Sequence, residues 1–273
     1  AGEVRIELRS CGVCHTDYSL AKGILDHQPI PSVLGHEGAG IIIDVGAGVS
    51  NVKKGDRVVM APIAPCGQCS RCLNLEGAYC EREEVRGWGI LPDGRTPLKD
   101  KNGKGVAIGF NTGFYSDYAV VPCTAVAKIP SNVSFEIASL LGCAVVSGYG
   151  AVVNTAKVEV ASSILVVGLG GVGLSAVMAA KLRGAYPIIG VDTNKERRSL
   201  AKEIGCDDVM SAEDFNNIDI NNFNGGFDSV IEASGSIPAI EKCMSLLRRH
   251  GICVYVGAAE SSYELKIPHL ELV

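Results

Sequence analysis

Residues 163–173 read SILVVGLGGVG, a short apolar run that leads directly into a cluster of glycines. The run at 163–167 predicts a buried strand, and residues 172–183 predict an amphipathic helix that begins among the glycines. The next predicted strand, 187–191, ends directly before Asp192. A strand, a GxGxxG turn, a helix and a later acidic residue together form the context of a dinucleotide-binding fingerprint. The residues of this glycine turn are Gly168, Gly170, Gly171, Val172 and Gly173.

Each part of this fingerprint has a physical reason. The first glycine allows a tight turn, the second lets the backbone approach a pyrophosphate, and the third lets the helix pack closely on the strand. Free N–H groups at the start of the helix hold the phosphates. Asp192 can accept hydrogen bonds from both hydroxyls of an adenosine ribose and would repel a 2′-phosphate, so the sequence predicts NAD rather than NADP. The alternative is a glycine-rich turn without a ligand.

The rest of the second half alternates between strands and helices. Residues 194–204 and 237–249 predict helices, and the remaining predicted strands are 208–210, 227–232 and 252–256. This alternation is typical of a doubly wound parallel sheet with helical crossovers. The complete form has about six strands, one more than the five predicted here. The chain also starts without Met, so we expect it to be truncated at both ends.

The first half has a different texture, rich in Gly, Pro and short β-branched runs, which predicts an irregular all-β domain. Its predicted strands are 4–8, 40–45, 57–60 and 118–122. We place the two domains at 1–145 and 146–273. Residues 87–109 show no apolar period and are interpreted as a solvated loop without a function.

Composition limits the classes of partner. The chain has 273 residues, enough for two domains, with 47% hydrophobic residues and a net charge of −5. An acidic chain without a basic stripe gives no reason to expect nucleic acid as a partner. No apolar run reaches the length of a membrane span. Eleven cysteines without a secretory signal favour the reducing cytoplasm over a disulfide-bonded secreted protein.

Four of these cysteines lie within CGQCSRCLNLEGAYC, residues 66–80. Two CxxC steps and a fourth cysteine can surround one ion, because sulfurs of one tight turn reach the same metal. Four thiolates leave no open position, so the predicted zinc is structural; an iron–sulfur cluster is the alternative. The predicted ligands are Cys66, Cys69, Cys72 and Cys80.

A second set of possible ligands is dispersed along the chain in CGVCHTD (11–17), GHEGAG (35–40) and GCAVVSGYG (142–150). A catalytic zinc commonly takes three protein ligands and leaves one position open. Cys14, His36 and Cys143 are the candidates, although each alone could be structural. Isolated cysteines are more often small buried apolar groups than ligands. We interpret these five in that way: Cys11, Cys123, Cys206, Cys243 and Cys253.

Taken in this order, these motifs resemble the medium-chain zinc-dependent alcohol dehydrogenases through essentially the whole chain. The resemblance implies a GroES-like β-barrel catalytic domain followed by a Rossmann domain, and a protein that extends beyond both ends of this chain. It implies that Cys14, His36 and Cys143 bind a catalytic zinc, in addition to the structural zinc held by the four-cysteine segment. Glu37 would be an alternate ligand, and Asp17 would orient the His36 imidazole.

The resemblance also implies the reaction, a hydride transfer between a primary or secondary alcohol and NAD. Thr16 would take the alcohol proton, and Ser19 stands where many members carry a relay histidine, so the end of the relay is open. His15 would bind the pyrophosphate, Ser147 would approach the nicotinamide, and Arg197 the adenosine ribose. In many members the sixth strand of the parallel sheet builds the dimer interface, and we expect the full-length protein to be a homodimer or homotetramer.

Three alternatives stay open at this point. Two are neighbouring enzymes, a formaldehyde dehydrogenase acting on a glutathione adduct and a polyol dehydrogenase. The glutathione-dependent members carry an arginine where this chain has Glu84, although Arg82 and Arg86 flank it. The third is a protein that binds zinc and NAD without turnover.

Overall fold

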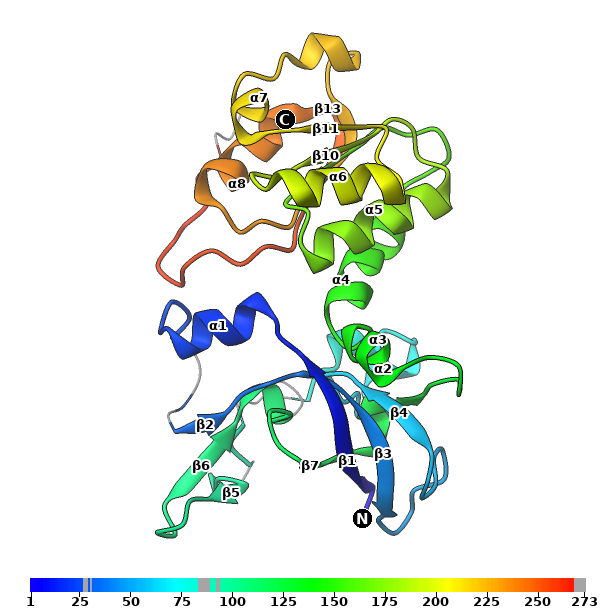
Figure 1. The fold of residues 1–273 in the computed structure, drawn as a ribbon, viewed down its shortest axis with the longest axis vertical. Coiled ribbons are helices and arrows are strands. Elements are labelled where there is room, and N and C mark those ends of the chain that lie inside the picture. The colour runs from blue at the N-terminus through cyan, green and yellow to red at the C-terminus, as the bar shows by residue number, and fades with distance from the viewer. Residues whose placement is uncertain (27–28, 30, 83–88, 92–93, 268–273) are drawn as a thin grey trace. The chain divides into compact units, whose positions relative to one another are not determined.

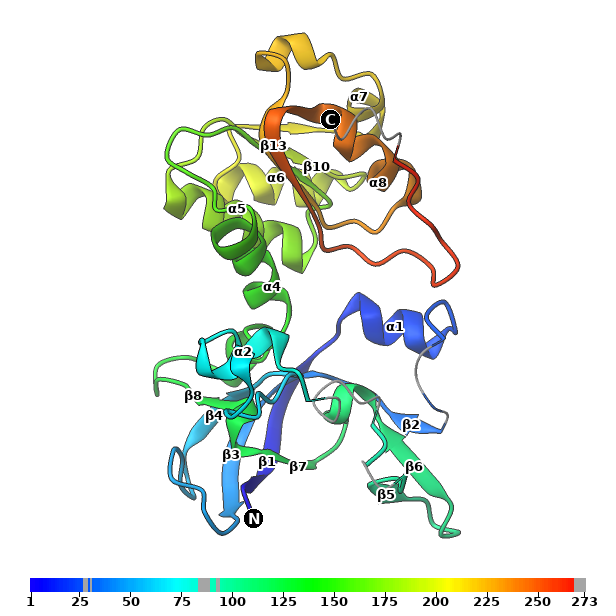
Figure 2. The same ribbon diagram turned by 180° about the vertical axis from the view of Figure 1, so that it is seen from behind.

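The computed structural model describes residues 1–26, 29, 31–82, 89–91 and 94–267, which form two compact units, Ala1–Cys143 and Ala144–Val273. The first unit is built on an antiparallel five-stranded sheet in the order β7-β1-β3-β4-β8 (Figure 1). The edge strand β8 is seen beside β4 in Figure 2. The strands are β1 (Glu3–Gly12), β3 (Glu37–Val45), β4 (Arg57–Met60), β7 (Tyr118–Pro122) and β8 (Val126–Lys128).

Alternation along the strands builds the core of this unit. Val4 and Ile6 of β1 point inward, while Glu3 and Arg5 between them face solvent. The buried cluster that they join also contains Ile42, Val58, Met60, Phe114 and Val121. The four strands predicted here are confirmed, and β1 and β3 are longer than expected.

A second, small sheet of this unit has the order β2-β6-β5: β2 (Ser32–Val33), β6 (Gly105–Ile108) and β5 (Leu98–Lys99). It contradicts the interpretation of residues 87–109 as a loop without regular structure. Asp100 closes the β5–β6 hairpin, because its Oδ1 accepts hydrogen bonds from the N–H groups of Asn102 and Lys104, each at 2.8 Å. Strands this short carry no apolar period that a sequence pattern can detect.

Three short α-helices of the first unit were not predicted: α1 (His15–Ala21), α2 (Ser70–Leu73) and α3 (Phe135–Leu140). In the part of this unit that the structure describes, three 3₁₀ turns accompany them, at Gly77–Tyr79, Gly109–Asn111 and Cys123–Ala125. Local capping starts two of the helices. The Asp17 carboxylate accepts from the Cys14 N–H at the start of α1, and the Ser134 hydroxyl accepts from the Ile137 N–H at the start of α3.

The second unit contains the parallel sheet in the order β11-β10-β9-β12-β13, which confirms the doubly wound prediction. Its strands are β9 (Ile164–Val167), β10 (Ile188–Val191), β11 (Asp208–Met210), β12 (Phe227–Glu232) and β13 (Leu247–Tyr255). Its α-helices are α4 (Ala144–Gly150), α5 (Gly171–Arg183), α6 (Lys195–Ile204), α7 (Ala212–Asn216) and α8 (Ile237–Cys243). Shorter turns complete the chain, namely a π-helical segment Ala151–Thr155 after α4 and 3₁₀ turns at Ile220–Phe223 and Met244–Leu246.

Both faces of the parallel sheet are covered. All four residues of β9 are buried: Ile164 and Val166 belong to the cluster formed with α5, and Leu165 and Val167 to the cluster formed with α7 and α8. A strand without a polar face is what a sheet covered on both sides requires. Among the described residues, no helix combines the length and the apolar sequence that spanning a bilayer requires.

One predicted element is wrong in its extent. The helix expected over 237–249 ends at Cys243, and after one 3₁₀ turn the chain enters β13 at Leu247. Leu247 pairs with Phe227 of β12, and the Arg248 guanidinium contacts the Asp228 carboxylate. The leucines at 246 and 247 fit a helical period as well as a strand, so only pairing with β12 decides between them.

Candidate metal centres and dinucleotide site

The four-cysteine segment folds around one point. α2 begins directly after Cys69, and the ligand atoms of all four cysteines lie within 4.8 Å of one another. The Sγ atoms of Cys66 and Cys72 are 3.9 Å apart, and those of Cys69 and Cys80 are 4.0 Å apart. Tetrahedral zinc with Zn–S bonds of about 2.3 Å needs sulfurs separated by about 3.8 Å. This donor set therefore fits a zinc ion.

The backbone around these sulfurs favours thiolates, the form that binds metal. The N–H groups of Gln68 and Cys69 donate to Sγ of Cys66, at 3.4 and 3.3 Å. These hydrogen bonds lower the pKa of Cys66, and backbone hydrogen bonds from Glu81 and Cys72 lower the pKa of Cys69 to about 6. The neighbouring Cys72 is the opposite case, because loss of solvent raises its pKa to about 12.

The dispersed residues also converge, within the first unit. Cys14 precedes α1, His36 stands immediately before β3, and Cys143 follows α3. One ligand atom of each lies within 4.8 Å of the others, and a carboxylate oxygen of Glu37 belongs to the same group. His36 and Glu37 are each only 2% exposed. A thiol, an imidazole, a second thiol and a nearby carboxylate form a donor set that fits zinc with one position left for another ligand.

Gly12 makes room for the Glu37 carboxylate. The two residues are partners in the β1–β3 pairing, and a Cβ atom at position 12 would lie 2.1 Å from Oε2 of Glu37. No side chain can therefore replace the glycine without displacing the carboxylate. Sequence reasoning missed Gly12, although its place inside CGVCHTD was a local signal.

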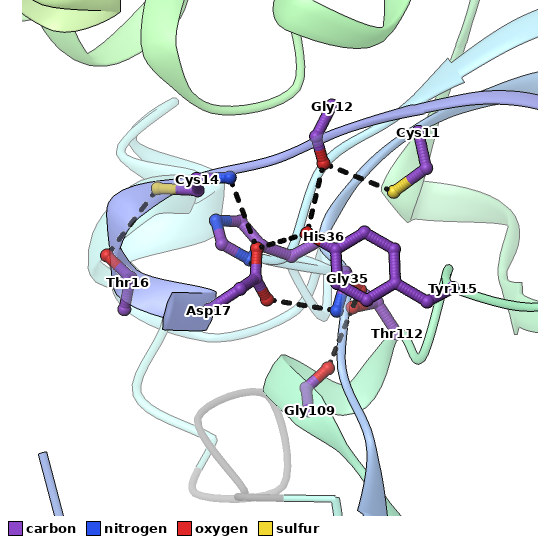
Figure 3. Close-up of polar contacts among 10 residues, drawn as sticks. All are labelled: Cys11, Gly12, Cys14, Thr16, Asp17, Gly35, His36, Gly109, Thr112 and Tyr115. Atoms are coloured by element: carbon purple, nitrogen blue, oxygen red, sulfur yellow. Dashed lines mark hydrogen bonds and ion pairs between the residues drawn. The ribbon is translucent and has the colours of Figure 1, made fainter. Parts of the chain in front are cut away.

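Asp17 organises the polar contacts around this cluster (Figure 3). Its Oδ1 lies 3.2 Å from Nδ1 of His36 and accepts the Gly35 N–H at 2.9 Å. Its Oδ2 accepts the Tyr115 hydroxyl at 3.2 Å and the Cys14 N–H at 3.4 Å. Because Asp17 engages Nδ1, the Nε2 lone pair of His36 is the one available to a metal.

The same contacts shift the pKa values of the groups in this cluster. A hydrogen bond from Cys143, with others from His36 and Thr16, lowers the pKa of Cys14 to about 3 and raises that of Cys143. Burial opposes a charged His36, but hydrogen bonds to Asp17 and Cys14 outweigh it and raise the His36 pKa to about 9. Burial also opposes the Asp17 carboxylate, yet its bonds to His36 lower its pKa. The cluster thus holds a thiolate that is ready to bind a cation.

The other predicted residues of the first unit lie on α1. The Thr16 hydroxyl is 3.5 Å from Sγ of Cys14, and Ser19 is 6% exposed. His15 is exposed at the helix start, with its ring centroid 5.6 Å from that of Tyr18. The five remaining cysteines, all within the described residues, lie outside both clusters, and burial raises the pKa of Cys11 to about 11 and that of Cys206 to about 12.

The glycine motif has the backbone approach that its pattern predicts. Gly168 has φ of +91°, and a Cβ atom at Gly173 would lie 1.7 Å from the carbonyl oxygen of Gly168. Gly170 is the N-cap of α5, and Gly171 and Val172 open the first turn, which leaves their N–H groups free of intrahelical partners. This geometry suits a phosphate at the start of α5.

Asp192 connects the end of β10 to this turn. Its Oδ2 accepts the Leu169 N–H and its Oδ1 accepts the Asn194 N–H, both at 2.8 Å. Nη1 of Arg197, in the first turn of α6, lies 3.7 Å from Oδ2. Ser147 is half-buried on α4, elsewhere in the same unit. Each carboxylate oxygen of Asp192 keeps a second lone pair for a hydroxyl donor.

Sequence reasoning missed three further residues around His36. Tyr115 contacts Asp17, the Phe110 ring centroid lies 4.7 Å from that of His36, and the Thr112 hydroxyl donates to the Gly35 carbonyl at 2.8 Å. They come from residues 110–115, far along the chain from the ligands. No local pattern signals such contacts, because only the folding of this segment against residues 34–36 produces them.

Comparison with known proteins agrees with this architecture. Residues 1–131 match the family described as alcohol dehydrogenase GroES-like domain, and residues 171–272 the family described as zinc-binding dehydrogenase. The chain is 36% identical to alcohol dehydrogenase 6 of Peromyscus maniculatus over 274 residues, covering 97% of this chain and 72% of that protein. It is 33% identical to S-(hydroxymethyl)glutathione dehydrogenase of Paracoccus denitrificans over 284 residues, covering 100% and 76%.

The structural likeness is equally extensive. The crystal structure of an alcohol dehydrogenase zinc-binding domain protein from Burkholderia ambifaria superposes with a TM-score of 0.91 at 33% identity, over 100% of this chain and 74% of that one. Fold and site thus define a zinc-dependent, NAD-linked alcohol oxidoreductase, with a GroES-like unit and a Rossmann unit. The chain belongs to the medium-chain zinc-dependent alcohol dehydrogenase family.

Proposed function

We propose that this protein interconverts primary or secondary alcohols with aldehydes or ketones, with Cys14, His36 and Cys143 as the ligands of a catalytic zinc. The observation that carries the proposal is the approach of their ligand atoms to within 4.8 Å. When bound, zinc supplies Lewis acidity that makes an alcohol hydroxyl acidic, and NAD accepts the hydride. In the same proposal, Cys66, Cys69, Cys72 and Cys80 hold a structural zinc.

The residues around His36 prepare the ligands. Asp17 fixes the imidazole tautomer and ring position through its contact with Nδ1. Tyr115 and the Gly35 N–H in turn fix the Asp17 carboxylate. Glu37, buried beside Cys143, is the alternate ligand that can replace a departing group.

The proton of the alcohol leaves through α1. Thr16 takes it, because its hydroxyl lies beside Sγ of Cys14 and can accept one proton while donating another. Ser19, buried one turn later, continues the path but is no base near neutral pH. Position 19 therefore does not supply the base at which the relay ends, and another group has to accept the proton.

The start of α5 would hold the dinucleotide. The N–H groups of Gly170, Gly171 and Val172 hold the pyrophosphate. For His15 of α1, the role at the pyrophosphate rests on the family resemblance. Asp192 and Arg197 bind the adenosine ribose, and Ser147 approaches the nicotinamide. Because Asp192 is a buried carboxylate, a 2′-phosphate is repelled and NAD is preferred.

A second candidate is the oxidation of S-(hydroxymethyl)glutathione, favoured by 33% identity to a dehydrogenase of that name over the whole chain. The position at which glutathione-dependent relatives carry an arginine is Glu84 here, which, with Arg86, lies outside the described residues. Arg82 lines a cavity of about 510 Å³ next to the four-cysteine segment. The substitution at position 84 makes this the weaker candidate.

One experiment separates the candidates. The protein is loaded with zinc, its zinc content is counted, and NADH absorbance is followed with ethanol, longer alcohols, a polyol and the glutathione adduct of formaldehyde. We expect two zinc ions per chain and turnover of simple alcohols. A chain that holds two zinc ions and NAD but is inert towards every substrate would overturn the enzymatic proposal and favour a binding role.

We also propose a homodimer or homotetramer in the cytoplasm. None of the eleven cysteines, all of which are described, forms a disulfide, and two thiolate clusters need a reducing compartment. Light scattering of the full-length protein measures the assembly, and a monomer at working concentrations would contradict it.

A further inference from the structure

Glu232, the last residue of β12, is a buried carboxylate that the proposed reaction does not use. Its side chain is completely inaccessible to solvent. Oε1 accepts three hydrogen bonds, from the N–H of Ser234 at 2.8 Å, the hydroxyl of Ser234 at 2.5 Å and the N–H of Gly235 at 3.0 Å. Oε2 has no hydrogen-bond partner among the described residues. An incompletely satisfied buried carboxylate is costly, and an apolar residue in its place would leave the three donors of the turn without their acceptor.

The turn that Glu232 holds lies against the glycine motif. The Ala233 N–H donates to the Val167 carbonyl at 2.7 Å, which extends the β9–β12 pairing by one residue. A Cβ atom at Gly168 would lie 2.7 Å from the backbone nitrogen of Ser234. The conformation of the turn and the position of the first glycine of the fingerprint are therefore fixed together.

This contact falls where ligands bind in such sheets. β9 leads through α5 to β10 on one side, whereas β12 leads through α8 to β13 on the other. Neighbouring strands whose connections diverge leave a crevice at their carboxyl ends, and dinucleotides bind there. Glu232 stands at the carboxyl end of one of these two strands, and Gly168 directly follows the other.

The carboxylate itself cannot reach a ligand. The Val256 and Gly257 N–H groups donate to the Glu232 carbonyl, at 2.8 and 3.0 Å. Gly257 covers Oε2, since a Cβ atom there would lie 2.5 Å from it. Glu232 can therefore influence a cofactor only through the turn that it shapes.

We propose that Glu232 is a positioning residue for the dinucleotide: it folds the turn at 233–235 so that Gly168 and the start of α5 are set for the pyrophosphate. The inference rests on the proposed NAD site. The cost of burying this carboxylate is balanced by the three hydrogen bonds that set the turn, which an apolar residue at position 232 could not make.

The test measures NAD binding by titration calorimetry on the zinc-loaded chain, and thermal unfolding of the same samples. Glu232→Ala removes the acceptor of all three turn hydrogen bonds, so the Kd for NAD should rise about tenfold or more. Glu232→Gln keeps an acceptor oxygen at the same place, so its Kd for NAD should stay within about threefold of that of the parent. Ser234→Ala, which removes one of the three bonds, should fall between them.

Val230→Ala is the control for a purely structural effect. Val230 is fully buried on the same strand and takes no part in the three hydrogen bonds of the turn, so its truncation should lower the unfolding temperature without raising the Kd. A Glu232→Ala chain that binds NAD within twofold of the parent, or a Kd that follows the unfolding temperature across all four variants, would overturn the inference alone. Absence of NAD binding by the unaltered chain would instead overturn the proposed function, and this inference with it.

Discussion

Oδ1 of Asp17 lies 3.2 Å from Nδ1 of His36, and both side chains are 3% exposed. A carboxylate held so close in a buried place leaves the imidazole one orientation and one tautomer. The Asp17 carboxylate is itself fixed by three more donors, so the orientation of His36 is set through a chain of contacts that reaches Tyr115.

Replacing Asp17 by Asn should therefore weaken the dispersed zinc site and spare the four-cysteine site. Loss of such a partner typically costs about 10–100-fold in metal affinity. Competition with a chelator should remove one zinc per chain at concentrations at which the parent keeps two. Asp117→Asn, an exposed carboxylate of the same unit, is the matched control. Equal loss of both zinc ions from the Asp17 variant would contradict the assignment.

Single cysteine substitutions should separate the two centres. Cys143→Ser is expected to lose one zinc and alcohol oxidation while keeping the unfolding temperature near that of the parent. Cys72→Ser should also lose one zinc, but with a fall of about 10 °C or more in unfolding temperature, because a structural zinc contributes directly to folding. Cys123→Ser, outside both clusters, should keep two zinc ions. Zinc analysis and calorimetry on the three variants decide the point; a Cys143 variant with both ions retained would remove Cys143 from the ligand set.

Asp192→Gly should shift the cofactor preference. Removing the carboxylate removes the repulsion of a 2′-phosphate, so kcat/KM with NADP relative to NAD should rise about tenfold or more. NAD itself should bind less well, since the Leu169 N–H loses its acceptor. Steady-state kinetics with both cofactors measure the ratio, and an unchanged ratio would show that Asp192 does not select the cofactor.

Ser19→His should change the pH profile of alcohol oxidation. A histidine at this buried position of α1 supplies a base near neutral pH that serine does not. We expect the acidic limb of kcat against pH to acquire a dependence near the ordinary pKa of histidine. Ser50→His, an exposed position of the same unit outside both clusters, is the control that should leave the profile unaltered. Identical profiles for parent and Ser19 variant would place Ser19 off the proton path.

Acid should weaken the second unit through Asp228. Burial opposes its charge, but the Arg248 guanidinium and the N–H and hydroxyl of Ser163 outweigh this and lower its pKa. Since the folded pKa lies below the unfolded value of about 3.9, the stabilisation is complete above that pH and is lost as pH falls through the folded pKa. Asp228→Asn should flatten this part of the curve of unfolding free energy against pH. If the unfolding free energy of the parent stays constant from pH 5 down to about pH 2, the role of Asp228 in acid stability is contradicted.

Much of the second unit could be predicted because its signals are local. The predicted strand, turn and helix lie at their observed places, apart from one or two residues at the ends. Their signals are the apolar run at 163–167, the glycines after it and Asp192 after the next strand. The prediction of a helix over 237–249 was wrong at its end. Leu246 and Leu247 fit the period of a helix as well as that of a strand, and pairing with β12 makes the chain a strand from Leu247. The helices α1 and α3, each under eight residues, are too short for an apolar period to detect.

The sequence by itself determined the parallel sheet, the glycine turn and the four-cysteine centre, because each depends on residues that are neighbours along the chain. Only the tertiary structure decided that Cys14, His36 and Cys143 meet, that Gly12 makes room for Glu37, and that Tyr115 supports Asp17. It also decided that the Glu232 turn and Gly168 touch. The physical reason is the same for all four: strand pairing and core packing bring these groups together across tens of residues, and no spacing in the sequence encodes such distances.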